Sequence, residues 1–260
     1  MKHKLTKQTI IIFLCIVLTI ILLIPRHFYN ETFISTTTGN MKKDILFLLR
    51  SYNRPEYLEK TLQYLDNSDI NRYCNDKYIY DDASNNEDTQ KILDNYKDTY
   101  NVLFNIVNHK QKSFVKFMEY VENIDTNRFN FICYLDNDAL VTTNFINTCK
   151  ETFRLIKKEQ GKKNNEIILT GFNTSNHPTI KSYGVYHLKK SIGGIHMFFH
   201  KSLLSDIKKW WDKKKDWGVV EEFTKIGGSL YCTNPSIVQH IGKIGDNSNG
   251  VTYDKSEIIL

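Results

Sequence analysis

The stretch Ile45 to Leu65, ILFLLRSYNRPEYLEKTLQYL, is the clearest indication of the fold in the sequence. It begins with a short apolar run, Asp44 to Leu49, that ends in a polar turn, as is typical of a buried parallel β-strand. Pro55 suits the first position of a helix, where the missing N–H would have no partner within the helix anyway. The apolar face of that helix would consist of leucines at helical spacing: Leu58, Leu62 and Leu65. The stretch therefore predicts a strand, a turn and a helix.

The same alternation continues along the first half of the chain. Short apolar runs predict further strands at Lys77 to Tyr80, Val102 to Val107 and Phe129 to Leu135, and helical patterns lie between them at Asp88 to Tyr96 and Ser113 to Glu122. Four β-α units in sequence predict a parallel sheet with right-handed crossovers. The fold class is therefore α/β, with a Rossmann-like, mostly parallel central sheet flanked by helices.

The second half of the chain has a more mixed pattern. Strands are predicted near Ile167 to Leu169, Ile195 to Phe199 and Ser229 to Cys232, and helices near Leu203 to Trp211 and Trp217 to Lys225. Neither a GxGxxG nor a GxxxxGK[ST] phosphate loop occurs, so ordinary dinucleotide-binding and P-loop proteins are poor candidates.

Acidic residues directly follow two of the predicted strands. They are Asp81 and Asp82 after the second strand, and Asp136 and Asp138 after the fourth. Ligands of open α/β sheets bind beyond the carboxyl ends of the strands, and these four residues would share that edge. The sequence therefore predicts a binding site there.

Asp136-Asn137-Asp138 is the strongest chemical signal. Two carboxylates at i and i+2, just past a buried strand, repel each other unless a cation offsets their charge. Oxygen ligands of this kind suit Mg²⁺ or Mn²⁺, which bind carboxylates together with substrate phosphates. The alternative is a solvated turn, since D-x-D is common in turns, but the preceding apolar FICYL run favours a site.

Asp81 and Asp82 allow two interpretations. Their carboxylates can accept hydrogen bonds from the N–H of a uracil-like base or from ribose hydroxyls. Alternatively they form an Asx-type turn or a helix cap, in which Asp82 or Ser84 satisfies backbone N–H groups. The two interpretations do not exclude each other.

Three segments together resemble glycosyltransferase family 2 and its GT-A-fold relatives: ILFLLRSYNRPEYLEKTLQYL, YIYDDASNNEDT and YLDNDAL. The resemblance runs from about Asp44 to Asp138 and more loosely to about His240. It implies that Ser51, Tyr52 and Arg54 lie by the nucleotide and that Asp82, with Asp81 beside it, faces base or ribose. It further implies that the Asp136-Asn137-Asp138 motif binds the diphosphate, with Asp136 and Asp138 lining the metal.

The resemblance also implies roles in the second half. Gly193 and Gly194 resemble the family's glycine turn beneath the acceptor site, with an ordinary tight turn as the alternative, and Trp217 is a candidate for stacking on an acceptor sugar. Asp216 matches the spacing of the family's catalytic acid and would act as general base, while the nearby Glu221 and Glu222 remain alternatives because the usual Glu-Asp pair is replaced by Lys215-Asp216. His240 is a candidate third metal ligand, although a lone histidine is more often a packed residue.

These features predict a metal-dependent glycosyltransferase. It would use Mn²⁺ or Mg²⁺ to move a sugar from a nucleotide-sugar donor, a UDP-sugar, to a hydroxyl of a glycan, glycoprotein or glycolipid acceptor. The resemblance to family 2 implies inversion at the anomeric carbon. The alternatives are a nucleotidyltransferase of similar fold and a catalytically inactive sugar-binding protein. The net charge of +6 is widely spread, and no run interleaves basic and aromatic residues, so nucleic acid is not an expected partner.

The N-terminus predicts a membrane anchor. Ile10 to Ile24 is an uninterrupted apolar run preceded by three lysines, which favours a cytosolic N-terminus. The expected organisation is a cytosolic segment 1–8, a transmembrane signal anchor 9–25, a stem 26–42 and a catalytic domain 43–260 that is luminal or extracytoplasmic. A cleaved signal peptide is the alternative. The triplet Asn173-Thr174-Ser175 fits the glycosylation sequon and would agree with a luminal domain.

Overall fold

The computed structural model describes residues 43–104 and 113–243. The predicted N-terminal segments 1–8, 9–25 and 26–42 lie outside this range, so the expected membrane anchor remains a prediction. None of the helices within the described ranges is both long and apolar enough to cross a bilayer. The predicted domain 43–260 is therefore described up to residue 243, except for residues 105–112.

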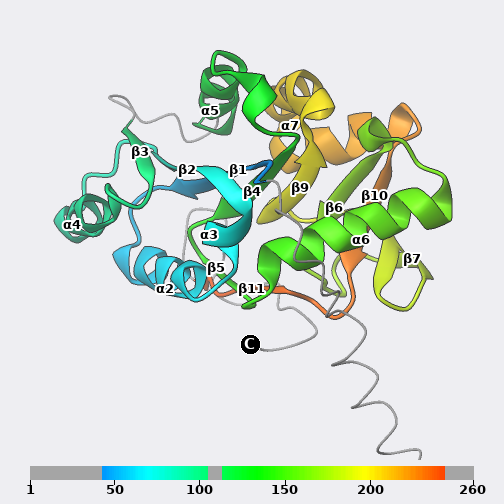
Figure 1. Ribbon diagram of the computed structural model, residues 1–260, viewed down its shortest axis with the longest axis horizontal. Helices are drawn as coiled ribbons and strands as arrows, with labels where there is room; N and C mark the ends of the chain where they lie inside the picture. The colour runs from blue at the N-terminus through cyan, green and yellow to red at the C-terminus, as the bar shows by residue number, and fades with distance from the viewer. Residues whose placement is uncertain (1–42, 105–112, 244–260) are drawn as a thin grey trace, which may run out of the picture. The chain divides into compact units, whose positions relative to one another are not determined.

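The strands are, in chain order, β1 Ile45–Ser51, β2 Cys74–Asp81, β3 Asn101–Phe104, β4 Phe131–Asp136, β5 Ala139–Val141, β6 Ile167–Thr170, β7 Thr179–Ser182, β8 Tyr186–Lys189, β9 His196–His200, β10 Ser229–Thr233 and β11 Val238–His240. The helices are α2 Pro55–Asp66, α3 Ile70–Tyr73, α4 Glu87–Tyr96, α5 Ser113–Glu122, α6 Phe145–Gln160 and α7 Leu204–Lys225, with short 3₁₀ turns η1 Thr126–Arg128, η2 Asn164–Glu166 and η3 Lys201–Leu203. Figure 1 shows their arrangement.

The first four strands form the predicted parallel sheet. The order is β3-β2-β1-β4, and each neighbouring pair is parallel. Chain order and sheet order differ as expected for crossovers through helices. Their carboxyl ends therefore lie at one edge, and the register sets Ser51 opposite Asp81 and Arg50 opposite Asp136.

The second half of the sheet is mixed. The order continues as β9-β6-β10-β8-β7, in which β9 is antiparallel to both β4 and β6, and β8 is antiparallel to β10 and β7. A separate antiparallel pair, β5 with β11, lies beside the main sheet. The predicted strands of this half are confirmed, whereas β5, β7, β8 and β11 are additional.

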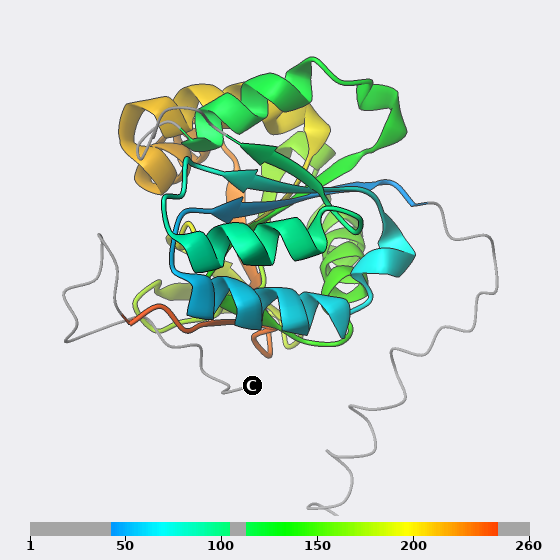
Figure 2. The same ribbon diagram turned by 90° about the vertical axis from the view of Figure 1, so that its left-hand side faces the viewer.

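Side chains of β1 alternate between the two faces of the sheet, as the strand period requires. Ile45, Phe47 and Leu49 belong to a core shared with α2, α3, α4 and α6, and Leu46 and Leu48 belong to a second core shared with α5 and α7. Figure 2 shows helices on both sides of the sheet. Because β1 is buried on both faces, its sequence is a continuous apolar run rather than an alternating one.

Helix α7 contains a break that matches the two helices predicted from the sequence. Lys214 and Lys215 have non-helical backbone angles, and Lys215 has a φ of 57° and a ψ of −140°. Gly218 packs against the backbone of the first half of the helix, so that a Cβ at this position would stand 2.1 Å from the carbonyl oxygen of Trp210. Just past the break, the carboxylate of Asp216 accepts the backbone N–H of Gly194.

One expectation about the second half is corrected, and one helix was not expected. Asn173 of the predicted sequon is buried, and its Oδ1 accepts a hydrogen bond from Lys189 Nζ at 3.0 Å, so the folded chain does not offer this side chain for glycosylation. Helix α6 is absent from the sequence prediction, although its apolar residues recur at helical spacing. These residues are Phe145, Ile146, Cys149, Phe153 and Ile156.

Candidate active site

The turn between β1 and α2 has an unusual backbone that the site depends on. Asn53 and Arg54 both have left-handed backbone angles, with φ values of 48° and 62°. Asn53 tolerates this conformation better than most residues. Its Oδ1 accepts the backbone N–H groups of Asn85 and Asn86 at 3.1 and 3.2 Å, and its carbonyl accepts Asn137 Nδ2 at 3.2 Å. Asn53 thereby connects the loops that follow β1, β2 and β4.

The two acidic residues after β2, Asp81 and Asp82, make different contacts. Both carboxylate oxygens of Asp81 accept hydrogen bonds from Ser84, from its N–H at 2.8 Å and its hydroxyl at 2.6 Å, which is the turn interpretation of this residue. Burial raises the pKa of Asp81, although the hydrogen bonds from Ser84 act to lower it. Asp82 is buried as well, its N–H donates to the carbonyl of Ser51 at 2.9 Å, and its charge acts on Arg50. Asp82 is therefore the member of the pair that lies toward the other carboxylates.

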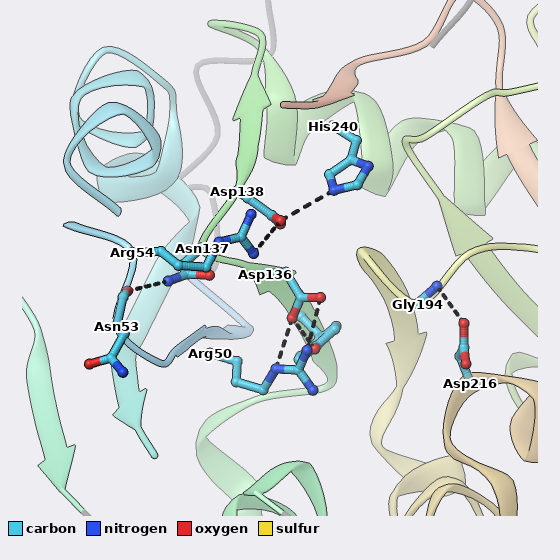
Figure 3. Close-up of polar contacts among 10 residues, drawn as sticks. Arg50, Asn53, Arg54, Asp136, Asn137, Asp138, Gly194, Asp216 and His240 are labelled. Carbon is cyan, nitrogen blue, oxygen red and sulfur yellow. Dashed lines mark hydrogen bonds and ion pairs between the residues drawn. The ribbon is translucent and has the colours of Figure 1, made fainter. Parts of the chain in front are cut away.

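Arg50, at the end of β1, forms an ion pair with the first carboxylate of the D-x-D motif. Its Nε lies 3.0 Å from Asp136 Oδ1 and its Nη2 lies 3.1 Å from Oδ2, a two-pronged contact (Figure 3). Tyr134 also donates its hydroxyl to Oδ1. Burial opposes the charge of Arg50, but Asp136, Tyr134, Asp138 and Asp82 together raise its pKa further above its usual range.

Asp138, the second carboxylate, is held from two sides. Arg54 Nη1 lies 2.8 Å from its Oδ2, and His240 Nε2 lies 3.2 Å from the same oxygen (Figure 3). The β5–β11 pair explains this meeting, because His240 pairs with Ala139 and the N–H of Ile241 donates to the carbonyl of Asp138 at 2.9 Å. A histidine distant in sequence is thereby fixed beside the motif.

Gly242 packs against Asp138, Arg54 and His240. A Cβ at this position would stand 2.1 Å from Asp138 Oδ2, 2.6 Å from Arg54 Nη2 and 2.8 Å from His240 Nε2. Backbone that lies this close to a carboxylate leaves room for glycine alone.

The carboxylates and the histidine change each other's proton affinity. Burial raises the pKa of Asp136 to about 6 against the pull of Arg50, and Asp138 adds to the rise. Burial would raise the pKa of Asp138 too, but the hydrogen bond and charge of His240, together with Arg54, lower it. Burial would lower the pKa of His240, but Asp138 raises it overall. Titratable groups whose pKa values are shifted by burial and by a charged neighbour are common at functional sites.

Asp216 faces the same region from the break in α7. Its Oδ2 accepts the N–H of Gly194 at 3.1 Å (Figure 3), and its Oδ1 accepts the N–H of Trp217 at 3.0 Å. Its charge acts on Tyr134, which itself binds Asp136. A Cβ on Gly194 would stand 2.9 Å from the Asp216 Cβ, so the two backbones approach closely only because this residue is glycine.

The alternative bases, Glu221 and Glu222, lie elsewhere on α7. Glu221 pairs with Lys214 at 2.9 Å, and Glu222 pairs with Lys225 at 3.0 Å and with Lys213 at 3.8 Å. The hydrogen bond from Lys225 lowers the pKa of Glu222. These are surface ion pairs within one helix, and they leave Asp216 as the acid that contacts the predicted acceptor turn.

The predicted acceptor residues lie next to Asp216. Gly193 is also closely packed, since a Cβ there would stand 3.0 Å from His177 Nε2. Trp217 is 57% exposed and continues directly from Asp216. An exposed indole beside a carboxylate provides an apolar face on which a sugar ring can stack.

The predicted metal set fits in part. Asp138 and His240 offer a carboxylate oxygen and an imidazole nitrogen that converge, and Mg²⁺ or Mn²⁺ binds through one or two protein ligands completed by substrate phosphates. Asp136 instead contacts Arg50 and Tyr134. Across 43–104 and 113–243, no three His, Cys, Asp or Glu side chains gather to hold a metal by themselves. The three-residue set Asp136, Asp138 and His240 therefore remains a prediction, of which Asp138 and His240 lie in direct contact.

Sequence reasoning missed Arg50. The residue stands in the quoted opening stretch as the only charge within β1, and a charge at the end of a buried strand is the signal that identifies it. Tyr52 lies half-buried in the turn that follows, and Ser51 is buried at the strand end. The predicted nucleotide residues thus occupy one edge, as their positions in the sequence imply.

A mixed sheet of this order, flanked by helices and acidic at its carboxyl edge, is the GT-A fold of nucleotide-sugar glycosyltransferases. The chain is similar to GalNAc-T7, crystallised with UDP, GalNAc and Mn²⁺, with 13% identity and a TM-score of 0.60 over 81% of this chain and 45% of that one. It is also similar to residues 1–349 of S. aureus TarS in complex with UDP, with 14% identity and a TM-score of 0.50 over 75% of this chain and 59% of that one.

The chain thus spans about half the length of these two structures. No protein-family model and no curated protein matches its sequence. At such low identity the likeness shows the fold, and the predicted GT-A resemblance is confirmed at that level.

Proposed function

We propose that the chain is a metal-dependent glycosyltransferase that transfers a sugar from a UDP-sugar to a hydroxyl of a glycan, glycoprotein or glycolipid acceptor. The observation that carries this proposal is the convergence of Asp138 and His240 on one point at the sheet edge, 3.2 Å apart. The GT-A fold supports it, and the UDP and Mn²⁺ bound by GalNAc-T7 and the UDP bound by TarS favour a UDP-sugar and a divalent cation.

In this proposal the loops after β1, β2 and β4 bind the donor. Asp82 accepts hydrogen bonds from the base or the ribose, with Ser51 and Tyr52 beside it. Asn137 belongs to the loop that binds the diphosphate, and its Nδ2 donates to the carbonyl of Asn53, which holds this loop to the loop after β1. Asp138 and His240 would hold the cation, which would supply positive charge to offset that of the leaving diphosphate. Arg50 keeps the carboxylate of Asp136 ionised and oriented for the donor sugar.

The acceptor binds on the other side of this edge. Asp216 takes the proton of the attacking hydroxyl, and the N–H of Gly194 keeps Oδ2 of this carboxylate oriented. Trp217 stacks on the acceptor sugar, above the glycine turn at Gly193. A single displacement with one base inverts the anomeric carbon. Residues 9–25 would anchor the chain with its N-terminus in the cytosol and the domain 43–260 on the luminal or extracytoplasmic side.

The test is a panel of nucleotide sugars, presented to the full-length chain in mild detergent with and without Mn²⁺. Release of UDP with a glycosylated acceptor supports the proposal, whereas release of pyrophosphate supports a nucleotidyltransferase. UDP binding without turnover on any donor would indicate an inactive sugar-binding protein. Asp138→Asn should abolish turnover, and Asp94→Asn, an exposed carboxylate on α4, is the matched control that should not.

A further inference from the structure

Each carboxylate of the D-x-D motif has its own guanidinium partner. Arg50 binds Asp136 and Arg54 binds Asp138, with nitrogen–oxygen distances of 3.0 and 2.8 Å. Both arginines are 28% exposed, and both carboxylates are more buried than their partners. The pairs are therefore partly shielded from water, where ion pairs are stronger than on an open surface. Two negative charges are already offset by two positive ones before any cation arrives.

Arg54 stands where a cation on Asp138 would have to bind. It donates to Oδ2, the same oxygen that His240 contacts, so the two groups converge on one oxygen of Asp138. Gly242 packs over this oxygen from a further side. A cation that binds Asp138 and His240 together therefore competes directly with the guanidinium of Arg54.

Arg54 is supported in this position by its surroundings. Its guanidinium lies 4.5 Å from the ring centre of Tyr57, and the hydroxyl of Tyr57 accepts the N–H of Lys243 at 3.3 Å. The Nε of Arg54 is buried and has no hydrogen-bond partner among the described residues. An unsatisfied buried donor is unfavourable, and a new acceptor such as a phosphate oxygen would satisfy it.

We propose that Arg54 is the internal counter-cation of Asp138 and must leave this carboxylate before a divalent cation binds, so that the free chain excludes the cation and takes it up together with the nucleoside diphosphate. The diphosphate brings negative charge that balances the incoming cation, and it offers acceptors to the displaced guanidinium. The inference rests on the proposed donor and metal, and it adds the order in which they bind.

The test measures Mn²⁺ binding to the nucleotide-free, full-length chain by the loss of the free-ion EPR signal. Arg54→Gln should bind Mn²⁺ about tenfold to a hundredfold more tightly than the wild type, the range expected when a charged hydrogen bond no longer has to be broken. Arg154→Gln, which also removes one positive charge from an ion pair, here with Glu151 on the exposed face of α6, should leave the affinity unchanged. A gain in affinity is not a result that damage to the fold produces.

Adding UDP separates this inference from the proposed function. In the wild type UDP should tighten Mn²⁺ binding, and in Arg54→Gln this gain should shrink, because the cation no longer has a competitor. If Arg54→Gln binds Mn²⁺ no better than the wild type, or neither binds it at millimolar concentration, Arg54 does not exclude the cation. Arg54→Lys, which retains the charge, should bind like the wild type. If no variant binds UDP, the proposed function fails, although the comparison of Mn²⁺ affinities still decides the role of Arg54.

Discussion

Replacing Lys215 with glycine should stabilise the fold, although the same replacement in a regular helix destabilises it. Lys215 has a φ of 57° and a ψ of −140°, which a side chain with a Cβ adopts only under strain. Such a residue costs about 1–3 kcal/mol, and glycine removes this strain. Glycine also loses more backbone freedom on folding, which offsets roughly 0.5–1 kcal/mol of the gain. The expected net stabilisation is about 1 kcal/mol.

Thermal unfolding of two variants measures this effect. A gain of about 1 kcal/mol raises the melting temperature by roughly 2–4 °C in a chain of this size. The control is Lys209→Gly, an exposed lysine in the helical first half of α7, which should lose about 1 kcal/mol instead. The two variants have the same composition, so the sign of the difference depends on the backbone alone.

If Lys215→Gly melts as far below the wild type as Lys209→Gly does, the backbone at position 215 is not strained. Sugar transfer should be retained in Lys215→Gly, because glycine keeps the break that brings Asp216 to Gly194. Loss of transfer together with a raised melting temperature would mean that the lysine itself has a role at the acceptor side.

Three further perturbations follow from the structure. Gly218→Ala would place a Cβ 2.1 Å from the carbonyl oxygen of Trp210, so the halves of α7 should separate, stability should fall by about 1–3 kcal/mol and transfer should drop at least about tenfold, measured by thermal unfolding and UDP release. Gly242→Ala would place a Cβ 2.1 Å from Asp138 Oδ2 and should weaken the binding of UDP in the presence of Mn²⁺ by about tenfold, as measured by calorimetry. Unchanged binding together with retained transfer would contradict this prediction. Burial lowers the pKa of His196 from 6.5 to about 3, so its stabilising neutral form is lost as the pH falls from 6.5 toward 3. That shift is worth roughly 4–5 kcal/mol, and His196→Gln should show a shallower loss of stability over this range in urea titrations.

The fold was predictable because its main signals are local. The apolar run of β1 and the leucines of α2 identify the first unit, and the strands that follow it have the same character. The strand ends also placed Asp82, Asp136 and Asp138 at one edge, since parallel strands end together. These are properties that a sequence expresses within about ten residues.

The fine structure of the site was not predictable in the same way. The meeting of His240 with Asp138 depends on β5 and β11, two three-residue strands that lie about a hundred residues apart and have no distinctive pattern. The contact of Asp216 with Gly194 follows a strained residue, Lys215, whose positive φ cannot be predicted from a lysine side chain. The ion pair of Arg50 with Asp136 was not expected, because it depends on the register of β1 against β4.

The two arginines owe their positions to different causes, and this difference decides which of them can move. Arg50 lies in β1, where the strand register sets it opposite Asp136 and its guanidinium contacts both oxygens of that carboxylate. Arg54 lies after the left-handed turn at Asn53, and only its side chain reaches Asp138. A change of side-chain rotamer therefore frees Asp138 without disturbing any strand. Deleting one residue from this turn should accordingly separate Arg54 from Asp138 and leave Arg50 on Asp136. Of the two built-in counter-cations, the one beside His240 is thus the one that a metal ion can replace.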